Sequence, residues 1–92
     1  MTKIEIVREI ASKTGLSTKD VMVVVESLMQ TIKSSMENGE EVFLRGFGSF
    51  IIKHRAEKTA RNISKNTTVI IPAHDVPAFK PAKEFMEMVS KE

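Results

Sequence analysis

The residue types in this chain that could do chemistry are concentrated in one segment, residues 53–65. Five cations lie there against a single acid, Glu57, which gives the segment a net charge of +4. The whole chain of 92 residues carries only +2, so its other residues together carry −2. Local positive charge of this kind attracts polyanions, most commonly nucleic acid. A charged loop in solvent is the alternative interpretation. The five cations are Lys53, Arg55, Lys58, Arg61 and Lys65.

Within this segment, Arg61-Asn62-Ile63 is the most specific pattern. Arginine and asparagine side chains can enter the narrow minor groove of DNA and hydrogen-bond there. Isoleucine is an apolar wedge that can slip between base pairs. The alternative interpretation is an ordinary hairpin tip with one exposed isoleucine.

Patterns typical of enzymes, metal sites and membrane proteins are not found in the sequence. It has no cysteine, and its two histidines, His54 and His74, have no paired ligand motif, so a structural zinc is not expected. The pair Gly46-x-Gly48 lacks the third glycine and following helix of a dinucleotide site. No apolar run approaches the roughly 18 residues of a membrane span, and no signal-peptide pattern opens the chain. We therefore expect a cytoplasmic protein that is not an enzyme and has no cofactor, metal or small-molecule substrate.

Two amphipathic helices are predicted before the basic segment. Thr2-Lys3-Ile4-Glu5 is a capping box, and Gly15 ends the helix that it begins. Ser17 starts a second helix, which Asn38-Gly39 ends. The two helices form a hairpin whose apolar stripe needs a surface to cover.

The rest of the chain is predicted to be mainly extended. Residues 41–53 change to a period of two and read as two strands around Gly46-Phe47-Gly48. Residues 54–72 then fit a long hairpin with its tip near residues 63–67. A return strand at residues 75–80 follows, and Pro81 suits the first turn of a final helix.

The small size of the chain favours a partner subunit. A domain of 10.3 kDa is marginally stable unless a disulfide, a metal or a second subunit supports it. Its best core candidates are the phenylalanines Phe47, Phe50, Phe79 and Phe85. Because Phe47 lies in a turn, we expect it to point into a core shared with another subunit.

Three motifs resemble the HU/IHF family of bacterial histone-like, DNA-bending proteins. They are Gly46-Phe47-Gly48-Ser49-Phe50, the pair Arg61-Asn62, and Val76-Pro77-Ala78-Phe79-Lys80, in the family's order and spacing. The resemblance implies one α+β domain over residues 1–92 that forms an intertwined dimer. An N-terminal helical hairpin, a three-stranded antiparallel sheet with long β-ribbon arms (about residues 54–72) and a short C-terminal helix are expected.

The resemblance also implies a function and a set of contacts. As a homodimer or a heterodimer with a paralogue, the protein would bind double-stranded DNA in the minor groove, bend it and compact the nucleoid, mostly independently of sequence. The arm residues expected to contact DNA are Lys53, Arg55, Lys58, Arg61, Asn62, Ile63 and Lys65, and the body residues are Lys3, Lys80 and Lys83.

Departures from the family pattern and two rival functions remain. Ile63 replaces the usual proline, Asn66 stands near the usual tip glycine, and Met86 stands where a further lysine is common. Minor-groove readout is degenerate, so the sequence leaves open a site-specific bending factor for recombination, replication or transcription. A protein-interaction module for an acidic partner is the other alternative.

Overall fold

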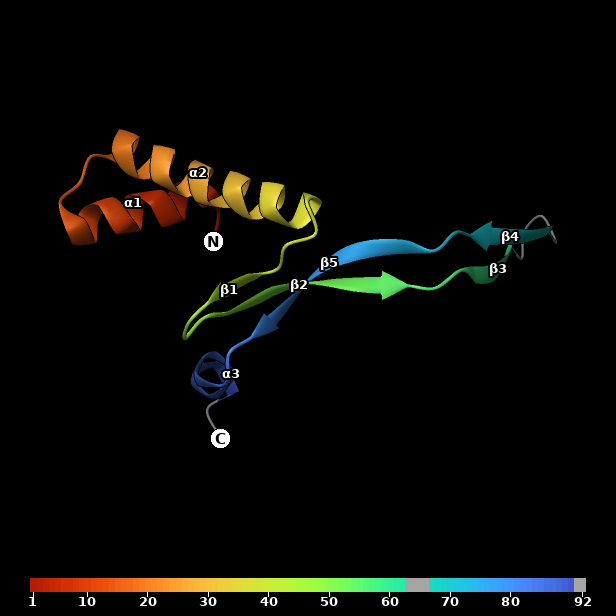
Figure 1. Cartoon of the computed structure of the whole chain (residues 1–92). Coiled ribbons are helices and arrows are strands. Elements are labelled where there is room, and N and C mark those ends of the chain that lie inside the picture. Colours follow the sequence, from red (N-terminus) through yellow and green to blue (C-terminus); the bar gives the residue numbers. More distant parts are fainter. Residues whose placement is uncertain (63–66, 91–92) are drawn as a thin grey trace.

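The structure is a computed structural model that describes residues 1–62 and 67–90. Helices α1 and α2 form a hairpin, strands β1, β2 and β5 a sheet, and β3 and β4 a ribbon that projects away from both (Figure 1). Helix α3 lies at the opposite end of the sheet from the ribbon. The predicted α+β class is confirmed. The bounds are α1 Lys3–Thr14, α2 Thr18–Glu37, β1 Val42–Leu44, β2 Gly48–Arg55, β3 Lys58–Asn62, β4 Thr67–Ile71, β5 His74–Pro81 and α3 Lys83–Ser90.

The helical hairpin begins and ends at the residues that the sequence indicated. The Thr2 hydroxyl accepts a hydrogen bond from the Glu5 amide, and the Glu5 carboxylate accepts one from Thr2, which completes the capping box. Gly15 ends α1 in the left-handed region, at φ 77°, where a residue with a Cβ is strained. The Ser17 side chain accepts from the Asp20 amide at 3.1 Å and starts α2.

The three-stranded sheet has the order β1-β2-β5 and is antiparallel throughout. The turn between β1 and β2 requires two glycines for different reasons. Gly46 has φ 81°, a backbone conformation that favours glycine. Gly48 lies against β5, and a Cβ there would stand 2.5 Å from a ring carbon of Phe79 and 2.6 Å from the Lys80 carbonyl oxygen.

The ribbon is paired in two stretches rather than along its whole length. Strands β2 and β5 remain paired as far as Arg55 and His74, and β3 and β4 pair from Lys58 opposite Ile71 outward. The step between the two stretches contains Pro72, which has no backbone N–H to donate to a ladder. The predicted hairpin over residues 54–72 is therefore present with a break near its root. Of its expected tip near residues 63–67, only Thr67, the first residue of β4, lies within the described residues.

Strand β5 extends the expected strand at residues 75–80 by one residue at each end. Pro77 and Pro81 both lie in it, which is possible because β5 is at the edge of the sheet. The prediction that Pro81 starts the last helix was wrong. Pro81 pairs with Gly48 at the end of β5, and α3 begins only at Lys83.

The chain by itself has a small core. Among the described residues, only Val7 and Val21 are buried hydrophobic side chains. The four predicted phenylalanines do cluster: the Phe47 ring centroid lies 5.1 Å from that of Phe79 and 5.3 Å from that of Phe85, and Phe50 lies 5.0 Å from Phe79. Even so, Phe47 and Phe79 stay 45% and 39% exposed.

Candidate nucleic-acid interface

The antiparallel register gives the sheet one cationic face. Side chains alternate between the two faces of a strand, and directly paired residues share a face. Arg55 pairs with His74, Lys53 with Val76, and Ser49 with Lys80. We call the face that carries these residues the basic face. It brings together three predicted DNA-binding residues, Lys53, Arg55 and Lys80, from two strands.

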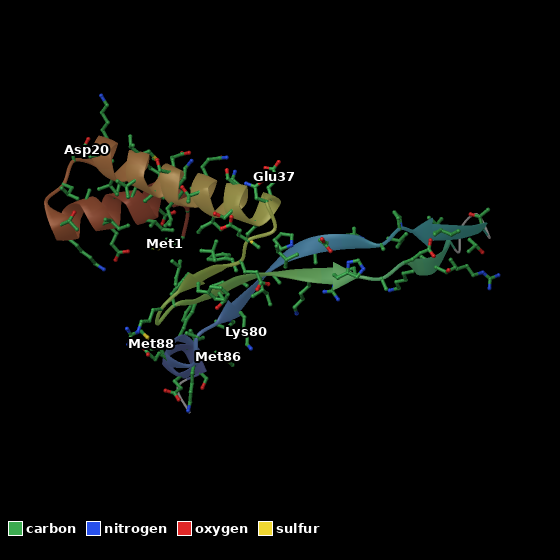
Figure 2. The ribbon with its side chains drawn as sticks, in the orientation of Figure 1. Met1, Asp20, Glu37, Lys80, Met86 and Met88 are labelled. Carbon is green, nitrogen blue, oxygen red and sulfur yellow. The ribbon has the colours of Figure 1, made fainter. Side chains whose placement is uncertain are left out.

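The other face of the same sheet is apolar. Phe50 pairs with Phe79, Ile52 with Pro77, and Val42 of β1 with Phe50. This face is turned toward α2, because Phe50 and Pro77 line a hollow of about 770 Å³ together with Met29 and Met36 of that helix. The basic face is therefore on the side away from the helical hairpin. Figure 2 shows Lys80 on the part of the sheet next to α3.

On the ribbon, the predicted residues divide between its two faces. Lys58 pairs with Ile71 and shares a face with Ala60 and Val69. Arg61 pairs with Thr68 on the opposite face and is exposed. Asn62 closes the β3–β4 ladder opposite Thr67, but its side chain, like Ile63 and Lys65, lies outside the described residues.

All of the described cations of the ribbon belong to β3. Strand β4 has the sequence Thr-Thr-Val-Ile-Ile and carries no charge, although each of its residues is exposed. The ribbon therefore presents one cationic strand beside one uncharged strand.

The body residues predicted to touch DNA lie in different surroundings. Lys83 is the first residue of α3 and lines a shallow hollow with Lys80. Lys3, at the start of α1, forms an ion pair with Glu26 of α2, with 2.5 Å between its Nζ and Oε1. The hydrogen bond and the charge of Lys3 lower the pKa of Glu26, with a smaller contribution from the charge of Lys33. The charge of Lys3 is thus partly neutralised by Glu26.

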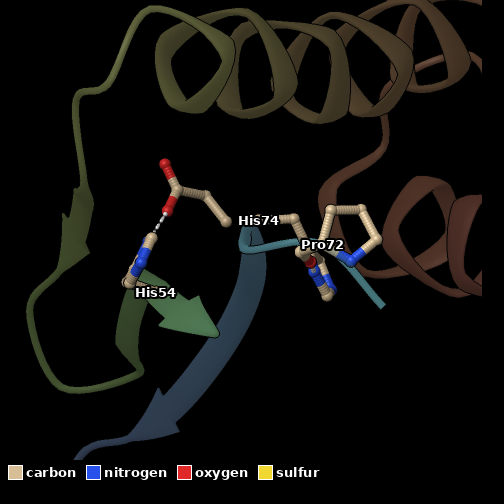
Figure 3. Close-up of polar contacts among 4 residues, drawn as sticks. His54, Pro72 and His74 are labelled. Carbon is tan, nitrogen blue, oxygen red and sulfur yellow. Dashed lines mark hydrogen bonds and ion pairs between the residues drawn. The ribbon is translucent and has the colours of Figure 1, made fainter. Parts of the chain in front are cut away.

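The two histidines lie at the root of the ribbon (Figure 3). His54 Nδ1 lies 2.8 Å from Oδ1 of Asp75, its partner in the ladder, on the apolar side of the sheet. His74 Nδ1 lies 2.9 Å from the carbonyl oxygen of Pro72, and His74 is on the basic face beside Arg55. The sequence indicated only that neither histidine belongs to a paired zinc-ligand motif. The alternation of side chains along β5 could have predicted that His74 shares a face with Lys80. The pairing of His74 with Arg55 could not have been predicted in this way, because it depends on the register between β2 and β5.

Within residues 1–62 and 67–90, no group of three or more His, Asp or Glu side chains is arranged to hold a metal ion. None of the helices in this part of the chain combines the length and apolarity needed to cross a lipid bilayer.

Comparison with known proteins identifies the family. Residues 1–90 match the family model described as bacterial DNA-binding protein. The chain belongs to this family. Its members are DNA-binding architectural proteins and not enzymes, as the motifs indicated. The resemblance to HU and IHF is confirmed.

Relatives of both kinds cover nearly the whole chain. Integration host factor subunit beta of Marinobacter nauticus is 47% identical over 98% of this chain and 93% of its own length. DNA-binding protein HU of Clostridium pasteurianum is 37% identical over 99% of this chain and 100% of its own. The cocrystal structure of Anabaena HU with DNA has a TM-score of 0.94 at 36% identity and covers all of both chains.

Proposed function

We propose that this protein binds duplex DNA as a dimer, reaches into the minor groove with its ribbon arms, and bends the duplex mostly independently of sequence. The observation that carries the proposal is the division of one sheet into a basic face and an apolar face. The apolar face turns toward α2, which leaves the basic face and the ribbon for a polyanion. That Anabaena HU was crystallised with DNA on the same fold supports this use.

The exposed apolar surface supports the dimer. The chain exposes 7859 Å², whereas a compact monomer of its mass would expose about 5,400 Å². Part of the excess belongs to the ribbon, but Val23, Leu28 and Phe47 of the body are also exposed. Permanent subunit interfaces bury about 2,000 Å² or more in total and are rich in such side chains. A second copy of the chain or a close paralogue would cover them.

The proposed contacts fall into two groups. Cations on the arm, on the basic face and at the starts of α1 and α3 would bind phosphates and release counterions, which makes affinity strongly dependent on salt. Residues at the ribbon tip would enter the minor groove, where an apolar wedge can unstack a base step and kink the duplex. The first group is Lys3, Lys53, Arg55, Lys58, Lys65, Lys80 and Lys83, and the second is Arg61, Asn62 and Ile63.

A bending assay tests the proposal. Energy transfer between dyes at the two ends of a duplex is measured at saturating protein, so that differences in affinity do not contribute. We expect Ile63→Asp to bend DNA much less than wild type, because it places a charge against stacked bases, whereas Ile63→Val bends it almost as well. If wild type and Ile63→Asp bend DNA equally, the arms bind the duplex but do not bend it. If wild type does not bind DNA at low salt, the proposed function is wrong.

A site-specific bending factor is the second candidate, and the similarity to integration host factor subunit beta favours it. Both kinds of protein would use the same fold, and they would differ in how strongly DNA shape and deformability select the site. A binding competition between random duplex and candidate-site duplex, at matched length and salt, distinguishes a site-specific factor from a sequence-independent one. In either case the protein would act in the cytoplasm, associated with the nucleoid.

A further inference from the structure

A hollow of about 460 Å³ lies at the root of the ribbon, where the β2–β5 ladder gives way to β3 and β4. Nitrogen-bearing side chains from three strands line it: Arg55 from β2, Lys58 from β3 and His74 from β5. Its other walls are the aliphatic side chains of Ala56, Ile71 and Val76. Three potential cations around an aliphatic wall form a site suited to an anion.

The hydrogen bond of His74 determines which of its ring nitrogens can meet a ligand. A carbonyl oxygen only accepts, so Nδ1 of His74 carries the hydrogen that it donates to Pro72. Nε2 is the remaining nitrogen. It has a lone pair in neutral imidazole, and it becomes a second donor when the ring takes up a proton. Only the protonated ring can donate from Nε2 to an anion in the hollow.

We propose that this hollow binds one backbone phosphate of DNA through Arg55, Lys58 and the Nε2–H of protonated His74, so that the protein takes up a proton there when it binds. The inference rests on the proposed function and extends it. No covalent bond changes: one solvent proton moves to Nε2, and the phosphate diester keeps its negative charge. Affinity for DNA should then rise as pH falls through the range in which histidine titrates.

The charged groups around His74 favour this assignment. Arg55 and Lys58 stand in the same hollow, and Glu57 lies in the short segment between them. Asp75 lies on the opposite face of the sheet, where it accepts the hydrogen bond of His54. From α2, Lys33 and Glu37 share a hollow with Asp75 and not with His74. Within the described residues, the hollow itself is lined by no acid that would compete with a phosphate.

Affinity measured against pH, at constant ionic strength, tests the proton uptake. A short labelled duplex is titrated by fluorescence anisotropy from about pH 5.5 to about pH 7.5, the range in which histidine changes charge. We expect wild type to bind about three- to tenfold more tightly at the lower pH, since one pKa unit corresponds to tenfold in affinity. His74→Asn should lose this dependence, because its amide can still donate to Pro72 but does not titrate.

The matched control is His54→Asn, which can still donate to Asp75 and should keep the pH dependence. If the dependence persists in His74→Asn, or disappears in His54→Asn alone, the proposal is overturned. Failure of the wild type to bind the duplex at any pH would instead contradict the proposed function.

A measurement on the wild-type protein needs no variant. The His74 ring resonance is followed by NMR through a pH titration, with the duplex, with inorganic phosphate and with chloride alone. We expect its midpoint to move to higher pH with the duplex. An unchanged midpoint would overturn the proposal. An equal shift with inorganic phosphate would assign the hollow to a free phosphorylated ligand and overturn the DNA assignment.

Discussion

Single contacts decide which cations of this protein are free to bind DNA. Lys3 is close to Glu26, whereas Lys80 and Lys83 share a hollow that no acid lines among the described residues. An exposed ion pair is weak, but a phosphate must replace it before the lysine can contribute to binding. If Lys3 contacts DNA as proposed, Glu26 would therefore compete with the duplex for this lysine.

Removing this competitor should strengthen binding. We expect Glu26→Gln to raise the affinity for a long duplex at low salt by about two- to fivefold, the range that corresponds to an exposed ion pair. Filter binding or anisotropy over a salt series measures it. Glu9→Gln is the matched control, because Glu9 pairs with Lys13, which is not a proposed DNA contact. Equal gains in both variants would point to net charge alone rather than to Lys3.

Gly48 shows how strictly one residue can be required by the tertiary structure. A methyl group there would meet Phe79 and the backbone of Lys80 at distances that real Cβ atoms do not have. We expect Gly48→Ala to lower the free energy of unfolding by about 1–3 kcal/mol, the usual range for overpacking. Urea denaturation measures the loss. Ser49→Ala is the control and should change stability much less, since Ser49 is on the other face of β2.

The helices and strands of this chain differ in how strongly their own residues and neighbouring strands stabilise them. Helices α1 and α2 are capped by their own residues, and β2 is held between β1 and β5. Within the residues that the structure describes, the ribbon of β3 and β4 has five residue pairs and no third strand, and each residue of β4 is exposed. An isolated two-stranded hairpin is marginally stable in water.

Hydrogen exchange should separate these elements. In the free protein we expect weak protection of the β3 and β4 amides and strong protection of the β2 amides at Phe50 and Ile51, because β2 is the central strand. DNA should slow exchange in the ribbon much more than in α1 or α2. Protection of β3 and β4 equal to that of β2 in the free protein would contradict the expectation.

The overall dimensions of the chain fit a subunit that binds a second chain and a polyanion, and they do not fit a compact monomer. Its radius of gyration is 18.8 Å, whereas a compact domain of this length has about 12 Å. Exposed apolar side chains also continue onto α3, where Met86 and Met88 project from the helix (Figure 2). The chain thus leaves uncovered the surface that a small domain would need to bury.

Stability should therefore depend on protein concentration. In an obligate dimer, folding and association are coupled, so the denaturation midpoint rises with concentration. We expect a clear rise over a hundredfold range at pH 7, followed by circular dichroism. Sedimentation at the same concentrations should give the mass of two chains. A monomer with a constant midpoint would refute the dimer.

The sequence by itself determined the local features of this protein. The capping box at Thr2, the helix end at Gly15 and the turn at Gly46 were predicted from residues a few positions apart, since caps and turns form between near neighbours. The motif resemblance likewise indicated the family before any contact was known.

Only the tertiary structure decided which distant residues meet. The pairing of Arg55 with His74 depends on the register between β2 and β5, and a slip of one residue would move every side chain of a strand to the other face. The pairing of Lys3 with Glu26 depends on how α1 packs against α2. The proposed phosphate hollow and the partly neutralised lysine both follow from such long-range geometry, which no local pattern in the sequence encodes.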